Sequence, residues 1–209
     1  MDPVKETINT FDKYAVEYES RYMNHAPYVE TYRLLSELLS ADAVILDAAC
    51  GPGNIASFLL QGFPDRKLHG IDLSAKMVAR ARLNNPAATF DVMDCRKIST
   101  LHQHYDAIVA GFCFPYLSRR EVRAFISDAR NRLNADGVFY ISFMAGDYTA
   151  SGLQTRNDVD WVCTYYHDPE LVIETLEATG FEVIDLDRKT VSNDGEPDTI
   201  DIFIYARMR

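Results

Sequence analysis

Short apolar runs alternate with longer amphipathic segments along most of this chain. The continuous run Val44-Ile45-Leu46 is bounded by turn residues, which indicates a strand covered on both faces. The same pattern predicts further strands at 67–71, 89–93, 105–110 and 138–143. Amphipathic helices are predicted after the strands, at 54–60, 74–83, 118–133 and 168–179. This alternation is typical of a parallel sheet with helices on both faces.

The end of the chain departs from this alternation. Residues 181–187 and 199–206 are predicted to be two strands, joined by the turn-rich segment SNDGEPD at 192–198 without a helix. Two strands joined in this way predict a hairpin. We therefore expect an α/β fold, a Rossmann-like and mostly parallel sheet of seven strands with helices on both faces and a C-terminal antiparallel hairpin.

A glycine-rich turn follows the first strand. Asp47 closes that strand, and the run GPGNIA from Gly51 begins the next helix. Glycine allows the backbone to bend sharply and to come close to a ligand. The run fits the dinucleotide fingerprint G-x-G-x-x-G/A, with Asp72 about 20 residues further on as the acid that binds a ribose. The sequence therefore predicts a site for a nucleoside cofactor.

The charges around this turn favour one cofactor over another. Asp47, Asp72 and Asp94 each follow or close one of the first three predicted strands. A nearby carboxylate repels the diphosphate that a dinucleotide places at a helix N-terminus. The same carboxylates suit a ligand that carries an ammonium and a sulfonium, which is S-adenosylmethionine. An NAD-dependent oxidoreductase is the disfavoured alternative.

From these residues, the chain resembles the class I S-adenosylmethionine-dependent methyltransferases, in particular those that act on small molecules. The first motif of that family is an acid followed by x-G-x-G-x-G, which stands here as Asp47-Ala48-Ala49-Cys50-Gly51-Pro52-Gly53. Ala49 occupies the first glycine position, and we expect a turn with negative φ there. The resemblance extends over 11–209. It implies a methyl-transfer reaction in which S-adenosylmethionine becomes S-adenosylhomocysteine.

The resemblance also implies roles for particular residues. It places Gly51 and Gly53 near the methionine part, Asp72 on both ribose hydroxyls, Leu73 beside the adenine and Asp94 on the adenine amino group. The residues that we expect at the cofactor are Tyr14, Asp47, Ala49, Gly51, Gly53, Asp72, Leu73, Met77, Asp94, Cys95, Gly111 and Phe112.

Composition agrees with one cytoplasmic domain over 1–209. The chain of 209 residues is long enough to bury a core without disulfide or metal cross-links. Its first residues lack the pattern of a signal peptide. No apolar stretch reaches the roughly 18 residues of a membrane span. The four cysteines form no C-x-x-C pair, so we predict neither a disulfide framework nor a metal site. The net charge of −10 argues against nucleic acid as a partner and favours a neutral or cationic small-molecule acceptor.

Two segments lie outside the sheet plan. In 1–40, aromatic residues recur at helical spacing from Phe11 to Tyr22, which predicts either a core-facing stripe or a helical cap that closes the cofactor cleft. The segment 145–167 is too long for a simple connection and is predicted to be a substrate or lid insert.

Methyl transfer needs a base only where the acceptor must lose a proton. His167 is our candidate, because histidine titrates near neutral pH, although a residue before Asp-Pro also suits a helix start. The segment after 105–110, GFCFPY, lacks the Asp/Asn-Pro-Pro-aromatic run of base and amide methyltransferases. We therefore predict a methyltransferase acting on an oxygen or nitrogen of a small molecule. A non-catalytic module that binds the cofactor or its product is the alternative.

Overall fold

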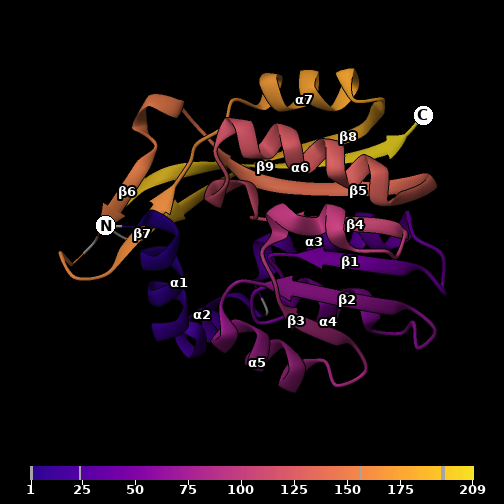
Figure 1. Ribbon diagram of the computed structural model, residues 1–209, viewed down its shortest axis with the longest axis horizontal. Helices are drawn as coiled ribbons and strands as arrows, with labels where there is room; N and C mark the ends of the chain where they lie inside the picture. Colours follow the sequence, from indigo (N-terminus) through magenta and orange to yellow (C-terminus); the bar gives the residue numbers. More distant parts are fainter. Residues whose placement is uncertain (1, 24, 156, 194–195) are drawn as a thin grey trace.

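The computed structural model describes residues 2–23, 25–155, 157–193 and 196–209. Its centre is a seven-stranded sheet with the strand order β3-β2-β1-β4-β5-β9-β8 (Figure 1). The strands are β1 (Val44–Ala48), β2 (Lys67–Asp72), β3 (Thr89–Val92), β4 (Tyr105–Gly111), β5 (Leu133–Ala145), β8 (Phe181–Asn193) and β9 (Glu196–Met208). The pairs among β1 to β5 are parallel, whereas β9 runs antiparallel to both β5 and β8. The predicted fold class is confirmed.

Several strands are longer than the sequence predicts. β5 begins at Leu133, so the predicted stop at 134–137 lies within the strand, where the register with β4 shifts. β8 and β9 extend beyond 181–187 and 199–206 because their antiparallel ladder continues to the pair Asn193 and Glu196. The centre of the predicted turn, at 194–195, lies outside the described residues.

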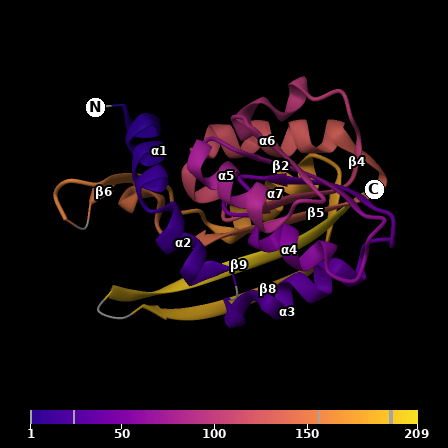
Figure 2. The ribbon, with the colours of Figure 1, turned by 90° about the horizontal axis from the view of Figure 1, so that it is seen from below.

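Helices cover both faces of the sheet (Figure 2). One face packs against α6 (Arg119–Arg132) and α7 (Pro169–Ala178), which contribute Phe125 and Leu176 to a buried cluster. The other face packs against α3 (Ala26–Glu37), α4 (Asn54–Leu60) and α5 (Ala75–Asn84). None of the helices in the described part of the chain has the length and hydropathy needed to cross a membrane.

The N-terminal residues form two further helices, α1 (Pro3–Lys13) and α2 (Ala15–Tyr22). Figure 1 shows them beside the carboxyl ends of the parallel strands. The segment 145–167 contains a short turn, η3 (Tyr148–Ala150), and two antiparallel strands, β6 (Gly152–Thr155) and β7 (Trp161–Thr164). This second, two-stranded sheet was not predicted, because its strands are short and interrupted by polar residues.

A row of polar contacts joins α1 to the β7 region, and we call it the α1–β7 seam. Thr7 Oγ1 accepts a hydrogen bond of 2.9 Å from the Cys163 N–H. Thr10 Oγ1 donates to the Trp161 carbonyl over 2.9 Å. Lys13 Nζ lies 2.8 Å from the Asp160 carboxylate. The seam ties the N-terminal helix to a segment more than a hundred residues away along the chain.

Candidate active site

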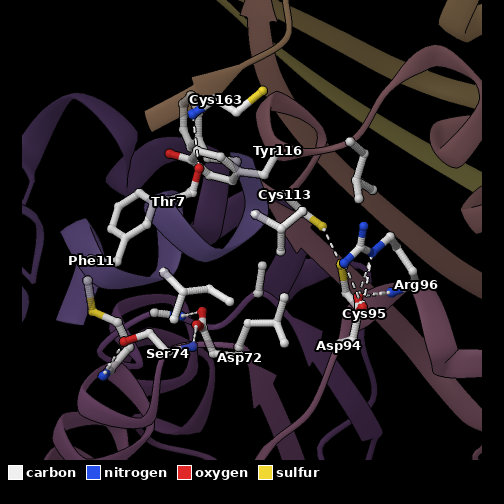
Figure 3. A pocket seen from close by; sticks show the side chains of 18 of the residues that line it. Thr7, Phe11, Asp72, Ser74, Asp94, Cys95, Arg96, Cys113, Tyr116 and Cys163 are labelled. Atoms are coloured by element: carbon white, nitrogen blue, oxygen red, sulfur yellow. Dashed lines mark hydrogen bonds and ion pairs between the residues drawn. The ribbon is translucent and has the colours of Figure 1, made fainter. Parts of the chain in front are cut away.

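A cleft opens at the carboxyl ends of the parallel strands, between the sheet, α1 and the β7 region (Figure 3). Open α/β sheets bind ligands at this edge, because the loops that follow the strands converge there. Nine of the residues predicted at the cofactor line the cleft: Ala49, Gly51, Asp72, Leu73, Met77, Asp94, Cys95, Gly111 and Phe112. The sheet thus brings together side chains that are spread over more than sixty positions of sequence.

The turn after β1 differs from our expectation. Ala49 has a φ of 58°, so the prediction of a negative φ at this position was wrong. A left-handed conformation costs a non-glycine residue roughly 1–2 kcal/mol. Gly51 also has a positive φ of 53°, and a Cβ atom there would lie 3.8 Å from the Tyr18 ring. Ala49 and Gly51 both line the cleft, so this strained turn forms part of its surface.

Gly53 has a different surrounding from the one predicted. It lies outside the cleft lining and precedes α4 with a φ of 83°. A Cβ atom at this position would meet Ala81 Cα at 3.3 Å and the Asn85 side chain. Glycine is therefore required here because the start of α4 packs closely on α5. Gly53 is not placed to contact a ligand in the cleft.

Asp72 is the best-organised acid in the cleft. Its Oδ2 accepts from the Gly51 N–H at 3.0 Å, and its Oδ1 accepts from the Ser74 N–H at 2.8 Å. Burial raises the pKa of Asp72, and these two hydrogen bonds oppose that rise. Each carboxylate oxygen keeps a free lone pair that can accept from a hydroxyl group. This arrangement is suited to a vicinal diol such as a ribose.

Asp47 lies deeper than the sequence indicated. It is 1% exposed and lies outside the cleft lining. Its Oδ2 has no hydrogen-bond partner among the described residues. Burial, and then the charge of Asp72, raise the pKa of Asp47 to about 8. An unpaired buried carboxyl group is costly, and a cationic ligand group nearby would relieve that cost.

Asp94 is paired with a basic residue that we did not predict. Arg96 binds both Asp94 oxygens, with its closest contact at 2.8 Å (Figure 3). It also forms an ion pair with Glu121 at 3.0 Å. Burial alone would raise the pKa of Asp94, but the Arg96 hydrogen bonds and charge hold it below its usual value. Asp94 therefore keeps its charge but is partly neutralised, so the cleft is less negative than three isolated carboxylates would make it.

Tyr14 lies outside the cleft lining, and its hydroxyl donates to Asp160 over 2.7 Å. Tyr18, one helical turn later, lines the cleft instead. Phe11 packs edge-on against both Tyr18 and Tyr116, with ring centroids 5.8 Å and 5.2 Å apart. Burial raises the pKa of Tyr18 and of Tyr116, so both phenols stay protonated at neutral pH. These aromatic residues form one wall of the cleft.

His167 is buried away from the cleft. It is 2% exposed, and its Nε2 lies 2.9 Å from the Phe114 carbonyl oxygen. Burial lowers the pKa of His167, which keeps the ring neutral. The side chain packs between Phe114 and Phe143, with ring centroids 6.3 Å and 6.0 Å away. His167 therefore packs in the core and does not line the cleft, so it is not placed to act as a base on a substrate there.

Other cleft residues could not be selected from sequence. Phe11 and Tyr18 were visible as part of the aromatic spacing in 1–40, without a sign of which faces the ligand. Arg96 and Cys113 directly follow the predicted site residues Cys95 and Phe112, and that proximity was the only available signal. Among the described residues, no group of three or more histidine, cysteine or acidic side chains is placed to hold a metal ion.

Comparison with known proteins bears on this site. Residues 45–137 match the family model described as "Methyltransferase domain". The chain is 32% identical to the ribosomal RNA small subunit methyltransferase C of Shewanella pealeana over 53% of its length and 34% of the relative's. It is 29% identical to the malonyl-[acyl-carrier protein] O-methyltransferase of Acetivibrio thermocellus over 47% of its length and 34% of the relative's.

The matched segment contains all but the first residue of β1, all of β2, β3 and β4, and with them the glycine turn, Asp72 and Asp94. Residues 45–137 therefore resemble a methyltransferase domain. The methyltransferase domain supplies most of the cleft, whereas α1 and β7 lie outside the matched segment.

The fold as a whole is also that of solved methyltransferases. The structure of Burkholderia thailandensis 1,6-didemethyltoxoflavin-N1-methyltransferase, with bound 1,6-didemethyltoxoflavin and S-adenosylhomocysteine, aligns with a TM-score of 0.72 and 19% identity. That alignment covers 100% of this chain and 91% of the other. By contrast, the chain spans 34% to 42% of the length of three curated relatives that it matches.

Proposed function

We propose that this protein is a methyltransferase that transfers the methyl group of S-adenosylmethionine to an oxygen or nitrogen of a small molecule. One observation carries the proposal. Within the methyltransferase domain, Asp72 is fixed by two backbone N–H groups at the floor of a cleft lined by nine of the expected cofactor residues. A second observation supports it, because Oδ2 of the buried Asp47 carboxyl group has no hydrogen-bond partner among the described residues.

The residues present fit the cofactor. Asp72 would accept from both ribose hydroxyls, and Leu73 would lie beside the adenine. Asp94 would accept from the adenine amino group while Arg96 holds its carboxylate in place. The low turn at Ala49 and Gly51 would accommodate the methionine part, with Asp47 beneath it to balance the ammonium charge.

When bound, S-adenosylmethionine supplies a methyl group on a sulfonium that a nucleophile can displace in line. The chain's own part is to position the acceptor and to exclude water. Phe11, Tyr18 and Tyr116 would hold the acceptor beside the methyl group, and their rings offer a favourable surface to a cation. The protonated phenols of the two tyrosines can donate hydrogen bonds but cannot take up a proton.

The charges of the cleft restrict the acceptor. Arg96 is the one basic residue that lines the cleft within the described chain, and it is paired with both Asp94 and Glu121. An anionic acceptor would find no free counter-charge there. We therefore propose a neutral or cationic acceptor. The names of the relatives mention O-methylation and N1-methylation, which agrees with oxygen or nitrogen as the attacked atom.

We also propose that 1–209 acts as one domain in which 1–40 and 145–167 close the cleft. The α1–β7 seam supports this, because α1 and Cys163 of β7 both line the cleft. Closure would exclude water from the reacting atoms.

The test has two parts. Calorimetry with S-adenosylmethionine and S-adenosylhomocysteine should show saturable binding of both. Labelled S-adenosylmethionine should then transfer its methyl group to members of a panel of phenols, amines, heterocycles and carboxylic acids, with the carboxylic acids inactive. Binding without transfer to any neutral or cationic acceptor would favour the non-catalytic module. Absence of binding would refute the proposed function.

A further inference from the structure

Two cysteine side chains meet in the wall of the cleft, and the proposed methyl transfer does not use the contact between them. Cys113 Sγ lies 3.5 Å from Cys95 Sγ and donates its S–H to it (Figure 3). Both residues line the cleft. Cys95 begins the short helix η1 (Cys95–Thr100) after β3, and Cys113 follows the end of β4. Because β2 and β1 separate β3 from β4 in the sheet, this contact joins two loops that the sheet does not pair.

We propose that Cys95 and Cys113 form a reversible oxidation site, whose disulfide prevents binding of the adenosyl cofactor. The inference rests on the proposed cofactor function. A disulfide bond is about 2.05 Å long, so the two sulfurs would have to approach by roughly 1.5 Å. Such a movement requires rotation of the two side chains and a small shift of one loop.

The two thiols have different tasks. Cys95 is half-buried and open to the cleft, whereas Cys113 is 1% exposed. The hydrogen bond with Cys95 and burial raise the pKa of the Cys113 thiol, which makes it the less reactive sulfur at the outset. Cys95 is therefore the sulfur that meets an oxidant first, and Cys113 is the resolving thiol beside it.

A hydroperoxide is the class of oxidant that fits these steps. The Cys95 thiol loses its proton, and the thiolate attacks the outer oxygen of the hydroperoxide. The O–O bond breaks, the sulfur becomes a sulfenic acid, and the departing alkoxide or hydroxide takes up that proton and leaves as alcohol or water. The Cys113 sulfur then attacks the Cys95 sulfur, the S–S bond forms and water leaves with the Cys113 proton. The two thiols lose two electrons in total, and the peroxide gains them.

The position of Cys95 explains why the disulfide would affect the cofactor. Cys95 stands between Asp94, the proposed adenine partner, and Arg96, which holds the Asp94 carboxylate. Movement of Cys95 towards Cys113 would displace that ion pair and narrow the cleft. The coupling must be reciprocal, so a bound cofactor would protect the two thiols from oxidation.

The experiment uses the full chain, first reduced and then treated with hydrogen peroxide. Mass spectrometry should show the loss of two hydrogen atoms and a peptide pair linking Cys95 to Cys113. Calorimetry should show S-adenosylhomocysteine affinity falling by at least about tenfold and returning after dithiothreitol. Prior addition of S-adenosylhomocysteine should slow formation of the disulfide.

Variants separate the site from general oxidation. In Cys113→Ser, peroxide should no longer lower the affinity, whatever the starting affinity of that variant is. Cys163→Ser is the matched control, because Cys163 also lines the cleft; it should still form the disulfide and lose affinity.

Two results would overturn the inference. One is the absence of a Cys95–Cys113 linkage after peroxide, and the other is undiminished affinity once the linkage is proven by mass. Failure of the reduced protein to bind S-adenosylhomocysteine would instead contradict the proposed function, and mass spectrometry reads the linkage independently of it.

Discussion

Asp72 is the residue on which the proposed cofactor site depends most. Two backbone N–H groups orient its carboxylate, so its free lone pairs are aligned before a ligand arrives. Hydrogen bonds to charged groups contribute roughly 1.5–3 kcal/mol each. Asp72→Ala should therefore reduce S-adenosylhomocysteine affinity by at least about tenfold, as measured by calorimetry. The exposed Asp42→Ala is the control and should bind as the wild type does. Unaltered affinity in Asp72→Ala would remove the central claim.

Asp47 gives a second prediction, concerned with pH. Its pKa is raised to about 8 from an ordinary value of 3.8, so the folded chain keeps a proton that the unfolded chain releases between these values. The free energy of unfolding therefore falls as pH rises from 3.8 towards 8. Asp47→Asn lacks this ionisation and should be more stable than the wild type at pH 7. Its Tm should rise by at least about 2 °C, with a smaller decline between pH 5 and pH 8.

The same substitution should lower the affinity for the ligand while raising the stability of the fold. Asp47→Asn removes the carboxyl group that is proposed to ionise beside the bound ammonium group, so S-adenosylhomocysteine affinity should fall although Tm rises. Asp201→Asn is the matched control, because Asp201 is also 1% exposed with a pKa raised by burial but lies in β9 and not in the strand that precedes the glycine turn. A Tm rise in Asp47→Asn without loss of affinity would contradict the proposed role of Asp47 in cofactor binding.

Single residues also mark the limit of sequence-based prediction. Asp72 was identifiable because the fingerprint fixes its distance from the glycine turn. The positive φ of Ala49 could not be predicted from sequence. Alanine seldom adopts a positive φ, and here only the surrounding fold imposes it. His167 has the chemistry of a base, and its burial against Phe114 depends on contacts distant in sequence.

At the scale of elements, local signals predicted well and distant contacts did not. Ser118 and Glu121 form a capping box that starts α6, and both partners lie within one helical turn. The α1–β7 seam depends on Thr10 and Trp161, which are 151 positions apart. No local pattern reports such a pair, so the N-terminal helix was predicted without its partner.

The seam leads to a prediction about closure. Thr7→Val preserves the shape of the side chain but removes the acceptor of the Cys163 N–H. A net contribution of roughly 0.5–1.5 kcal/mol per hydrogen bond predicts a two- to tenfold loss of S-adenosylhomocysteine affinity. Thr175→Val is the matched control, because Thr175 also donates to a carbonyl four residues earlier but lies in α7. Equal affinities in the two variants would show that the seam does not support the site.

Hydrogen exchange tests the same idea without a substitution. S-adenosylhomocysteine should increase the protection of α1 and of β6 and β7, because both α1 and β7 contribute to the cleft. The flanking helices α6 and α7 should exchange at nearly the same rates with and without the ligand. Uniform exchange in α1 and β7 would contradict the proposal that 1–40 and 145–167 close the cleft.

At the scale of the whole molecule, two properties matter: the net charge and the order of the strands and helices. With 31 acidic and 21 basic residues, the chain repels anions at long range, and this much was evident from sequence. The fold class was also predictable, since the order of strands and helices follows from periodicity. The distribution of charge within the cleft was not, because the pairing of Arg96 with Asp94 and the burial of Asp47 are tertiary effects.

This distribution predicts how the protein distinguishes two nucleoside cofactors. NAD carries a diphosphate, which needs free N–H groups at a helix N-terminus. Here the Gly53 N–H already donates to the Cys50 carbonyl at 3.0 Å, and Gly53 lies outside the cleft lining. Negative charge on Asp72 would add repulsion towards the diphosphate, and low salt would strengthen that repulsion. Titration with NAD should therefore show no binding at concentrations that saturate the protein with S-adenosylhomocysteine. Comparable affinities, unaffected by salt, would mean that the cleft accepts a dinucleotide and would restore the oxidoreductase alternative.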